Sequence, residues 1–351
     1  MNVILIFSST KAADLEIGGK FNTSITGYYS QDSEFAYIPQ ANLDWELFLP
    51  RWGNNEIRCA GNVYTNLEEG KIDFFWKKLY WKHRFDKFHL TVGRQPISWS
   101  FGSLLNPVDY SLGAEALDRE YNAKYQDALE LYYPINWHTS LSLTVSPMSN
   151  WEDFKIGIRG RTLVNDFDVA VHFIQEQIKN KGKGTQRFGI TAKGDLGKYG
   201  VYGSLGYYHD EKKSYSFLLG VDYSYFFQTG SRLYLQAEYL TIPPEMLAQI
   251  TGSIMNNAQY DIEKNIQLLV TNASYQIDEF SNIGMTVFYN ACDNSTIFMP
   301  NYSNQIKDNI NFKIQAGIIN QSVVNTNPEN NTIVSDNNRS GFIEIGFDYT
   351  F

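Results

Sequence analysis

The chain has no run of about 18 consecutive apolar residues, so it lacks the segment that a transmembrane helix needs. With a mean hydropathy of -0.34 and 19% charged residues, it is too polar for a helical membrane protein. The net charge of -9 argues against a nucleic-acid partner, although the interior of a channel can still be locally basic. Proline is also scarce, at 10 of 351 residues.

The chain has only two cysteines, Cys59 and Cys292, which lie far apart in the sequence. We predict two unpaired thiols, with a disulfide as the alternative. There is no C-x-x-C motif and no Cys/His spacing typical of a metal site. The sequence therefore predicts neither a metal nor a cofactor.

Aromatic residues are abundant, and they recur with a period of two. The chain has 24 Tyr, 23 Phe and 7 Trp. Apolar and polar residues alternate from Leu15 to Tyr29, and again from Phe35 to Leu49. Such alternation predicts strands with one apolar and one polar face. Runs of 10 to 15 residues exceed the usual globular strand and match what a tilted strand needs to cross a bilayer.

Similar runs continue to the end of the chain. They lie near residues 55–66, 71–85, 88–96, 126–134, 137–146, 153–163, 167–177, 186–196, 199–208, 215–226, 232–241, 264–277, 282–291, 297–307, 310–320 and 339–351. The total is about eighteen, an even number as in bacterial single-chain barrels. Alternation is irregular at 71–85 and 297–307, so sixteen strands is the alternative.

The connections between these runs support the same architecture. Short turns, such as 86–87 and 197–198, alternate with connections that include the three long segments 97–125, 242–263 and 321–338. Short periplasmic turns and longer external loops alternate in this way in transmembrane barrels. A soluble β-sandwich would show shorter strands, and no fixed-period repeat suggests a solenoid. We predict an all-β chain, with one antiparallel transmembrane β-barrel at 13–351 and the remnant of a secretory signal at 1–12.

In such a barrel the apolar parity faces lipid and the polar parity faces the lumen. The lumen parity carries Lys155, Arg159 and Arg161 on one predicted strand, and Arg187 and Lys193 two strands later. Isolated cations on this parity are Lys20, Arg58, Arg232 and Lys313. Acids on this parity include Asp44, Glu46, Glu56, Asp168, Glu176, Glu238 and Asp348. Charges that line a pore set its ion preference.

The third external connection, 97–125, is the predicted constriction loop. It carries Asp109, Glu115, Asp118 and Glu120, and Arg94 lies at its root. We predict that it folds into the lumen, where its acids face the cluster of Arg159, Arg161 and Arg187. A solvated surface loop is the alternative.

The stretch from Gly93 to Asp109 resembles outer-membrane porins. It contains Gly93-Arg94-Gln95, Trp99 and Asn106-Pro107-Val108-Asp109, similar to a hairpin and loop of the barrel families that include alginate-export-type channels. The last strand, GFIEIGFDYTF, resembles the signal that the barrel assembly machinery reads. This resemblance implies a bacterial outer membrane and passive transport. Homotrimerisation is expected by analogy alone.

The predicted function is passive diffusion of small hydrophilic solutes and ions, with membrane lipids as the surroundings and no catalysis. The predicted pore-lining residues are Arg94, Asp109, Glu115, Asp118, Glu120, Lys155, Arg159, Arg161, Arg187 and Lys193. The predicted closing strand is marked by Gly341, Phe347, Tyr349 and Phe351, which we expect to face lipid.

Two alternatives to a general diffusion channel remain open. A channel selective for saccharides or anionic polysaccharides would use lumen aromatics, among them Trp99, Tyr202 and Tyr208. A barrel enzyme is the other alternative, although none of the five histidines sits in a G-x-S-x-G or H-E-x-x-H motif.

Overall fold

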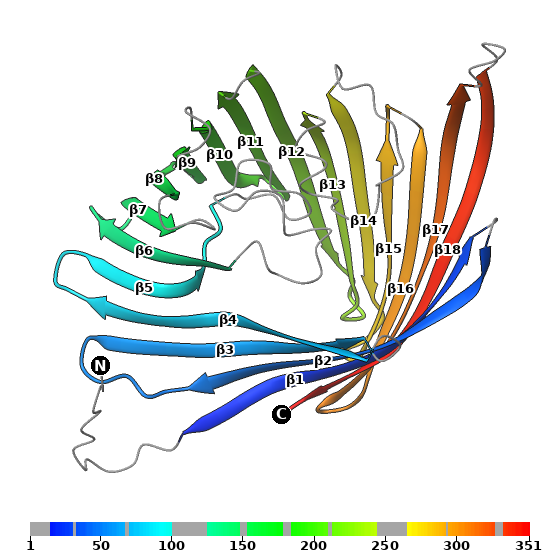
Figure 1. The fold of residues 1–351 in the computed structure, drawn as a ribbon, viewed down its shortest axis with the longest axis horizontal. Coiled ribbons are helices and arrows are strands. Elements are labelled where there is room, and N and C mark those ends of the chain that lie inside the picture. The colour runs from blue at the N-terminus through cyan, green and yellow to red at the C-terminus, as the bar shows by residue number, and fades with distance from the viewer. Residues whose placement is uncertain are drawn as a thin grey trace.

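The computed structural model describes residues 15–30, 33–66, 70–99, 125–147, 153–177, 184–209, 213–243, 265–292, 294–326 and 333–351. These residues form one closed barrel of 18 antiparallel strands (Figure 1). Among them, no helix is long and apolar enough to cross a bilayer. The predicted signal remnant at 1–12 lies outside the described residues.

Each strand pairs with its neighbours in the sequence, and β1 also pairs with β18. The strands are β1 (Glu16–Ser30), β2 (Ser33–Phe48), β3 (Asn55–Asn66), β4 (Lys71–Arg84), β5 (His89–Pro96), β6 (Tyr125–Pro134), β7 (Thr139–Pro147), β8 (Phe154–Val164), β9 (Phe167–Gln177), β10 (Gln186–Leu196), β11 (Tyr199–His209), β12 (Lys213–Phe226), β13 (Arg232–Ile242), β14 (Ile266–Gln276), β15 (Ser281–Asn290), β16 (Ser295–Lys307), β17 (Ile310–Thr326) and β18 (Ile333–Thr350). The count of eighteen is confirmed.

The predicted long connection at 321–338 is wrong. Strand β17 continues to Thr326 and β18 begins at Ile333, and their pairing runs without a break from Ile310↔Tyr349 to Thr326↔Ile333. The prediction ended the strand where apolar and polar residues stop alternating. The β-branched residues beyond that point, among them Val323 and Val324, favour extended backbone, so the strand pairing continues past it.

Turns of two to six residues join the strands at one end of the barrel, and the two long connections, 97–124 and 243–265, join strands at the other end. Turns such as 165–166 between β8 and β9 and 197–198 between β10 and β11 lie at the end that holds Phe351, which we call the short-turn rim. Asn165 and Gly197 have φ of 53° and 65°, the left-handed backbone that tight hairpins require. In the β14–β15 turn, the N–H groups of Phe280 and Ser281 donate to the Asp278 carboxylate and lower its pKa.

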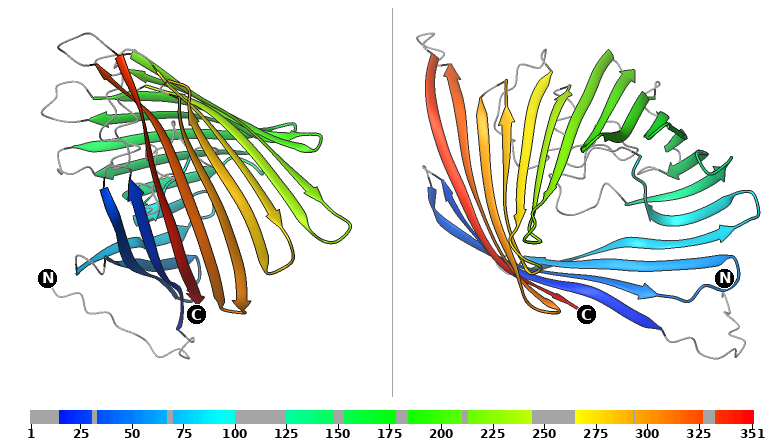
Figure 2. Two further views of the ribbon diagram at one scale, coloured as in Figure 1. Left: turned by 90° about the vertical axis from the view of Figure 1, so that its right-hand side faces the viewer. Right: turned by 180° about the vertical axis from the view of Figure 1, so that it is seen from behind.

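Figure 2 shows the barrel wall that β10–β18 form from two further sides. Large apolar side chains along these strands are exposed on its outer face. On β18, Ile343, Ile345 and Phe347 are exposed, whereas Asp348 is buried on the inner face. Many large apolar residues are exposed on the outer face, as expected for a barrel that is surrounded by lipid.

Strand β4 contains a bulge that explains its irregular alternation. Ala60 pairs with Lys78 and Gly61 pairs with Trp76, so Lys77 is an extra residue without a register partner on β3. Before the bulge the even residues Ile72, Phe74 and Trp76 face outward; after it the odd residues Leu79 and Phe85 do. Because side chains alternate between the two faces, one extra residue changes whether even-numbered or odd-numbered residues face outward in the rest of the strand.

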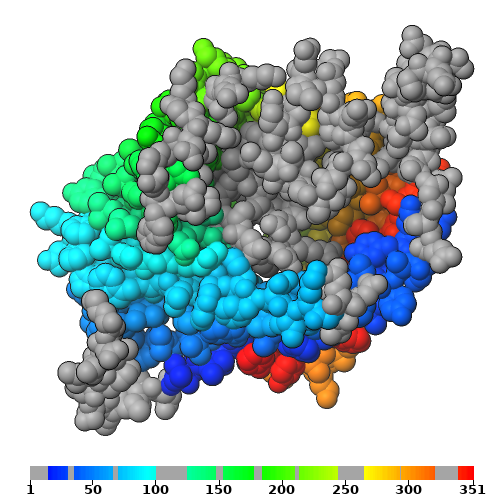
Figure 3. Space-filling model, in the orientation of Figure 1, coloured from blue at the N-terminus to red at the C-terminus, as the bar shows by residue number. Residues whose placement is uncertain are grey.

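The ends of the chain form the closing seam. Residues of β1 (blue) and β18 (red) lie side by side on the surface in Figure 3, with Lys20↔Thr350 and Ser30↔Ser340 near the ends of their pairing. Beyond the ladder, Gly19 and Phe351 exchange two backbone hydrogen bonds of 3.0 Å. The outward placement of Phe347, Tyr349 and Phe351 agrees with their exposure.

Asp348 joins three strands across this seam on the inner face. Its carboxylate lies 2.8 Å from Lys20 Nζ of β1 and also pairs with Lys313 of β17. We expect Asp348→Asn to lower the unfolding free energy by about 1–3 kcal/mol, because two ammonium groups lose a mostly buried carboxylate. The temperature at which the folded band disappears in semi-native electrophoresis measures this loss.

A compensated variant provides the control for this effect. Asp348→Asn combined with Lys20→Gln and Lys313→Gln removes both orphaned charges and should recover most of the loss. If Asp348→Asn alone matches the wild type, the triad does not stabilise the seam.

Candidate functional site in the barrel lumen

The first charged wall of the lumen lies on β8, β9 and β10. On β9 the Glu176 carboxylate lies between two predicted cations, 3.3 Å from Lys155 Nζ and 2.6 Å from Arg187 Nη2. Arg161 Nε donates to Asp168 of β9 at 2.8 Å. The structure therefore brings Lys155 and Arg187 together through Glu176, whereas Arg161 pairs with Asp168 farther along the same wall.

Arg159 and Lys193 lie on the same wall. Arg159 is the register partner of His172 on β9, and Lys193 is the register partner of Asp168. Lys193 Nζ also lies 6.0 Å from the ring centroid of Tyr202 on β11. Five predicted cations thus share one region of the inner face, where a channel would present them to a passing solute.

The segment after β5 turns into the lumen. Trp99 is 2% exposed and stacks on His172 of β9, with ring centroids 5.8 Å apart. Ile97 and Trp99 form a buried cluster with Ala128 of β6 and Ile174 of β9. Because β9 is four strands away from β5, these contacts place the root of the predicted constriction loop inside the barrel.

The four predicted acids of that loop, Asp109, Glu115, Asp118 and Glu120, lie outside the described residues. Arg94 does not join the cation wall: its Nη1 lies 3.3 Å from Asp127 of β6, and its guanidinium lies 4.6 Å from the Phe75 ring. Gly93, at φ of 120°, turns the backbone immediately before it.

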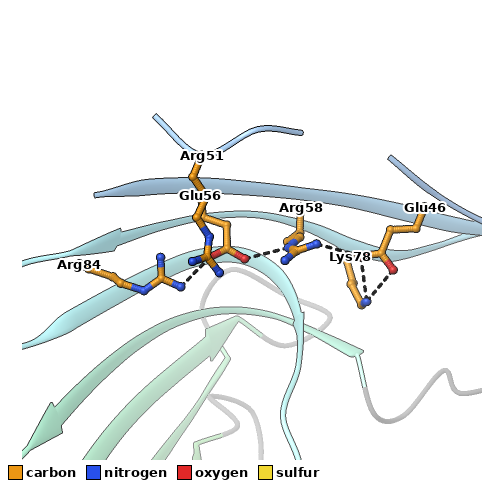
Figure 4. A network of polar contacts seen from close by, with 6 residues as sticks. All are labelled: Glu46, Arg51, Glu56, Arg58, Lys78 and Arg84. Atoms are coloured by element: carbon orange, nitrogen blue, oxygen red, sulfur yellow. Dashed lines mark hydrogen bonds and ion pairs between the residues drawn. The ribbon is translucent and has the colours of Figure 1, made fainter. Parts of the chain in front are cut away.

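A second charged wall, on β2, β3 and β4, contains residues that the sequence analysis did not identify as a group. Figure 4 shows its core: the Glu56 carboxylate receives Arg58 Nε at 2.8 Å, Arg84 Nη2 at 2.6 Å and Arg51 Nη2 at 3.2 Å. Lys78 Nζ lies 3.0 Å from Glu46 Oε2. The even-numbered residues from 78 to 84 all face the lumen, which the sequence could have indicated. Before the bulge at Lys77 the odd-numbered residues face the lumen, so the run as a whole looked irregular.

The lumen aromatics that a saccharide track would need are engaged in packing. Tyr202 is buried, donates to Glu238 and accepts from Gln236 Nε2 at 2.7 Å. Tyr208 is also buried, 3.0 Å from the Ser216 hydroxyl. In the part of the chain that the structure describes, no three His, Cys, Asp or Glu side chains gather where they could hold a metal ion.

Comparison with solved structures shows the fold of outer-membrane β-barrels. OpdL of Pseudomonas aeruginosa aligns with a TM-score of 0.61 at 10% identity, covering 96% of this chain and 99% of that one. OprB of Pseudomonas putida gives 0.54 at 10% identity, covering 96% and 94%. Wzi of Escherichia coli, described as a carbohydrate-binding outer-membrane barrel involved in group 1 capsule assembly, gives 0.58 at 14% identity, covering 94% and 84%. No protein-family model and no curated protein matches the chain.

Proposed function

We propose that this chain is an outer-membrane porin, a water-filled channel through which small hydrophilic solutes and ions diffuse down their gradients. The observation that carries the proposal is the charged wall on β8–β10 inside a closed barrel of 18 strands. A barrel of this size encloses an aqueous lumen. The outward apolar surface supports an outer-membrane location, and no chemical step is required of the protein.

The constriction is proposed to form between the β8–β10 wall and the segment that enters the lumen at Ile97. In this proposal Asp109, Glu115, Asp118 and Glu120 face Arg159, Arg161 and Arg187 across the narrowest part of the pore. Opposite charges on two sides of a pore orient dipolar solutes and favour ions of one sign locally. The buried root at Ile97 and Trp99 supports this arrangement.

Neutralising Arg159, Arg161 and Arg187 to glutamine is expected to shift the reversal potential toward cation selectivity. The physical reason is that Asp168 and Glu176 keep their charges while each of them loses its arginine partner. Planar-bilayer recordings in a KCl gradient measure the shift. Lys198→Gln, in the exposed β10–β11 turn, is the control for a charge change away from this wall. An unchanged reversal potential in the triple variant would show that these arginines do not line the conducting path.

A channel for saccharides or anionic polysaccharides is the second candidate, because Wzi, which has a similar fold, is described as carbohydrate-binding. The engagement of Tyr202 and Tyr208 in packing favours the general porin over this candidate. Large ohmic conductance without block by oligosaccharides would support the general porin. Block by micromolar oligosaccharide would support the selective channel, and hydrolysis of lipid or peptide by the pure protein would contradict both.

The partners in this proposal are membrane lipids, the transported solutes and the barrel assembly machinery. Lipid contact is supported by an apolar groove of about 530 Å³ on the outer face of β13–β17, floored by small residues such as Ala273, Gly284 and Ala316. Assembly into a homotrimer is proposed by analogy, and nucleic acid is not proposed as a partner.

A further inference from the structure

We infer that the β2–β4 wall is a binding site for small oxyanions, the carboxylate or phosphate groups of passing solutes, and that Glu56 positions its arginines. This inference rests on the proposed channel function and adds a solute class and a second site to it. We call this site the rim cluster; it comprises Glu46, Arg51, Glu56, Arg58, Lys78 and Arg84 (Figure 4).

The rim cluster lies on the inner face beside the short-turn rim. Glu56 is the second residue of β3, Arg84 is the last residue of β4, and Arg51 lies in the turn between β2 and β3. Lys78 is followed on β4 by the outward residue Leu79, and Arg84 is followed, just past the end of β4, by the outward residue Phe85. A solute that crosses the barrel therefore passes this cluster in addition to the β8–β10 wall.

The charges of the rim cluster do not balance. Four cations, Arg51, Arg58, Lys78 and Arg84, face two carboxylates, Glu46 and Glu56. The Glu56 side chain is only 7% exposed, and it holds all three guanidinium groups at once. The carboxylate thus acts as a buried anchor, and the four cations and two carboxylates leave the cluster with a net charge of +2.

The cations keep donors available on the lumen side. The side chains of Arg58 and Arg84 are both 30% exposed, and that of Arg51 is 58% exposed. Within the described residues, Arg84 contacts Glu56 through Nη2 alone, which leaves Nε and Nη1 for another acceptor. Planar guanidinium groups match carboxylate and phosphate oxygens through paired hydrogen bonds. Groups that are already held in place lose less conformational entropy when an anion binds.

Glu56 is a positioning residue in this scheme. Simple electrostatics predicts that removing its negative charge would improve anion binding. The geometry predicts the reverse, because three guanidinium groups that share one carboxylate would repel one another and separate once it is neutralised. The two predictions differ in sign, so a single substitution distinguishes them.

The test uses the full chain in planar bilayers, with chloride current as the readout and potassium succinate or inorganic phosphate as the probe. For the wild type we expect concentration-dependent block by at least one probe. Arg58→Gln, Arg84→Gln and Glu56→Gln should each raise the half-blocking concentration about tenfold, as expected when a charge-assisted paired contact is lost. Comparison of the two probes shows whether the site prefers carboxylate or phosphate.

Arg232→Gln is the matched control, because Arg232 is a cation of the inner face at the start of β13, away from the rim cluster. It should leave the block unchanged. Semi-native electrophoresis shows that each variant is folded, and Arg84→Lys, which keeps the charge but loses the planar fork, should give an intermediate effect.

The inference is overturned if conducting wild-type channels show no block by either probe, if Glu56→Gln strengthens the block, or if Arg232→Gln weakens it as much as Arg84→Gln. In all three cases the channel function itself stands. An absence of any conductance from folded protein would instead contradict the proposed function.

Discussion

Deletion of Lys77 is expected to leave a barrel that still assembles, with the facing of the other β4 residues unchanged. Lys77 is the extra residue of the β4 bulge, and its neighbours Trp76 and Lys78 already lie opposite Gly61 and Ala60, which follow one another on β3. Without Lys77, the outward residues Phe74, Trp76 and Leu79 belong to one strict alternation through β4. The expected cost is the ion pair between Lys77 and Asp44, which contributes up to about 1 kcal/mol. Heat-modifiable mobility in electrophoresis reports whether a folded barrel forms.

Lys77→Ala is the matched control for this deletion. It removes the ion pair between Lys77 and Asp44 but keeps the number of residues in β4. We expect this variant to fold and to lose little stability, since partly exposed ion pairs contribute up to about 1 kcal/mol. A deletion variant that fails to fold beside a folded Lys77→Ala variant would show that the barrel needs the bulge itself, and that β4 does not tolerate strict alternation at this point.

The bulge also shows where sequence patterns reach their limit. Strict alternation from Leu15 to Tyr29 and in the last strand predicted these strands and their facing, because lipid requires an apolar outer face throughout. The same rule obscured the rim cluster, since the residues from Lys78 to Arg84 follow the opposite parity from those before Lys77. A bulge depends on the pairing with the neighbouring strand. Here consecutive residues of β3, Ala60 and Gly61, pair with Lys78 and Trp76, and the sequence of β4 alone does not give this pairing.

The sequence predicted which residues form the β8–β10 wall, but it did not predict which of them are in contact. Period two places Lys155, Arg159 and Arg187 on the inner face, but it does not give the stagger between neighbouring strands. The register decides that Glu176 lies opposite Lys155 and close to Arg187. Likewise, Trp99 was predicted to lie in the lumen loop, but its stacking on His172 depends on a path across four strands.

Substitution of Trp99 by alanine is expected to give a channel of larger conductance. The indole is buried against His172, and with Ile97 it holds the chain on β9 at the point where the proposed constriction segment begins. Truncation of a buried tryptophan to alanine costs about 3–5 kcal/mol in a packed core, which is enough to release a contact made by so few residues. The substitution also removes the volume of the ring from the lumen. The outer wall is unaffected, so folding should persist.

Single-channel recordings measure the effect, with semi-native electrophoresis as the check on folding. Trp99→Phe is the matched control, because it retains an aromatic ring that can stack on His172, and its conductance should stay close to that of the wild type. Trp137→Ala, at a fully exposed residue of the β6–β7 turn, controls for loss of an indole outside the lumen. Equal conductance for the wild type and a folded Trp99→Ala variant would mean that the segment rooted at Ile97 does not limit the flow of ions. The constriction would then have to lie elsewhere in the barrel.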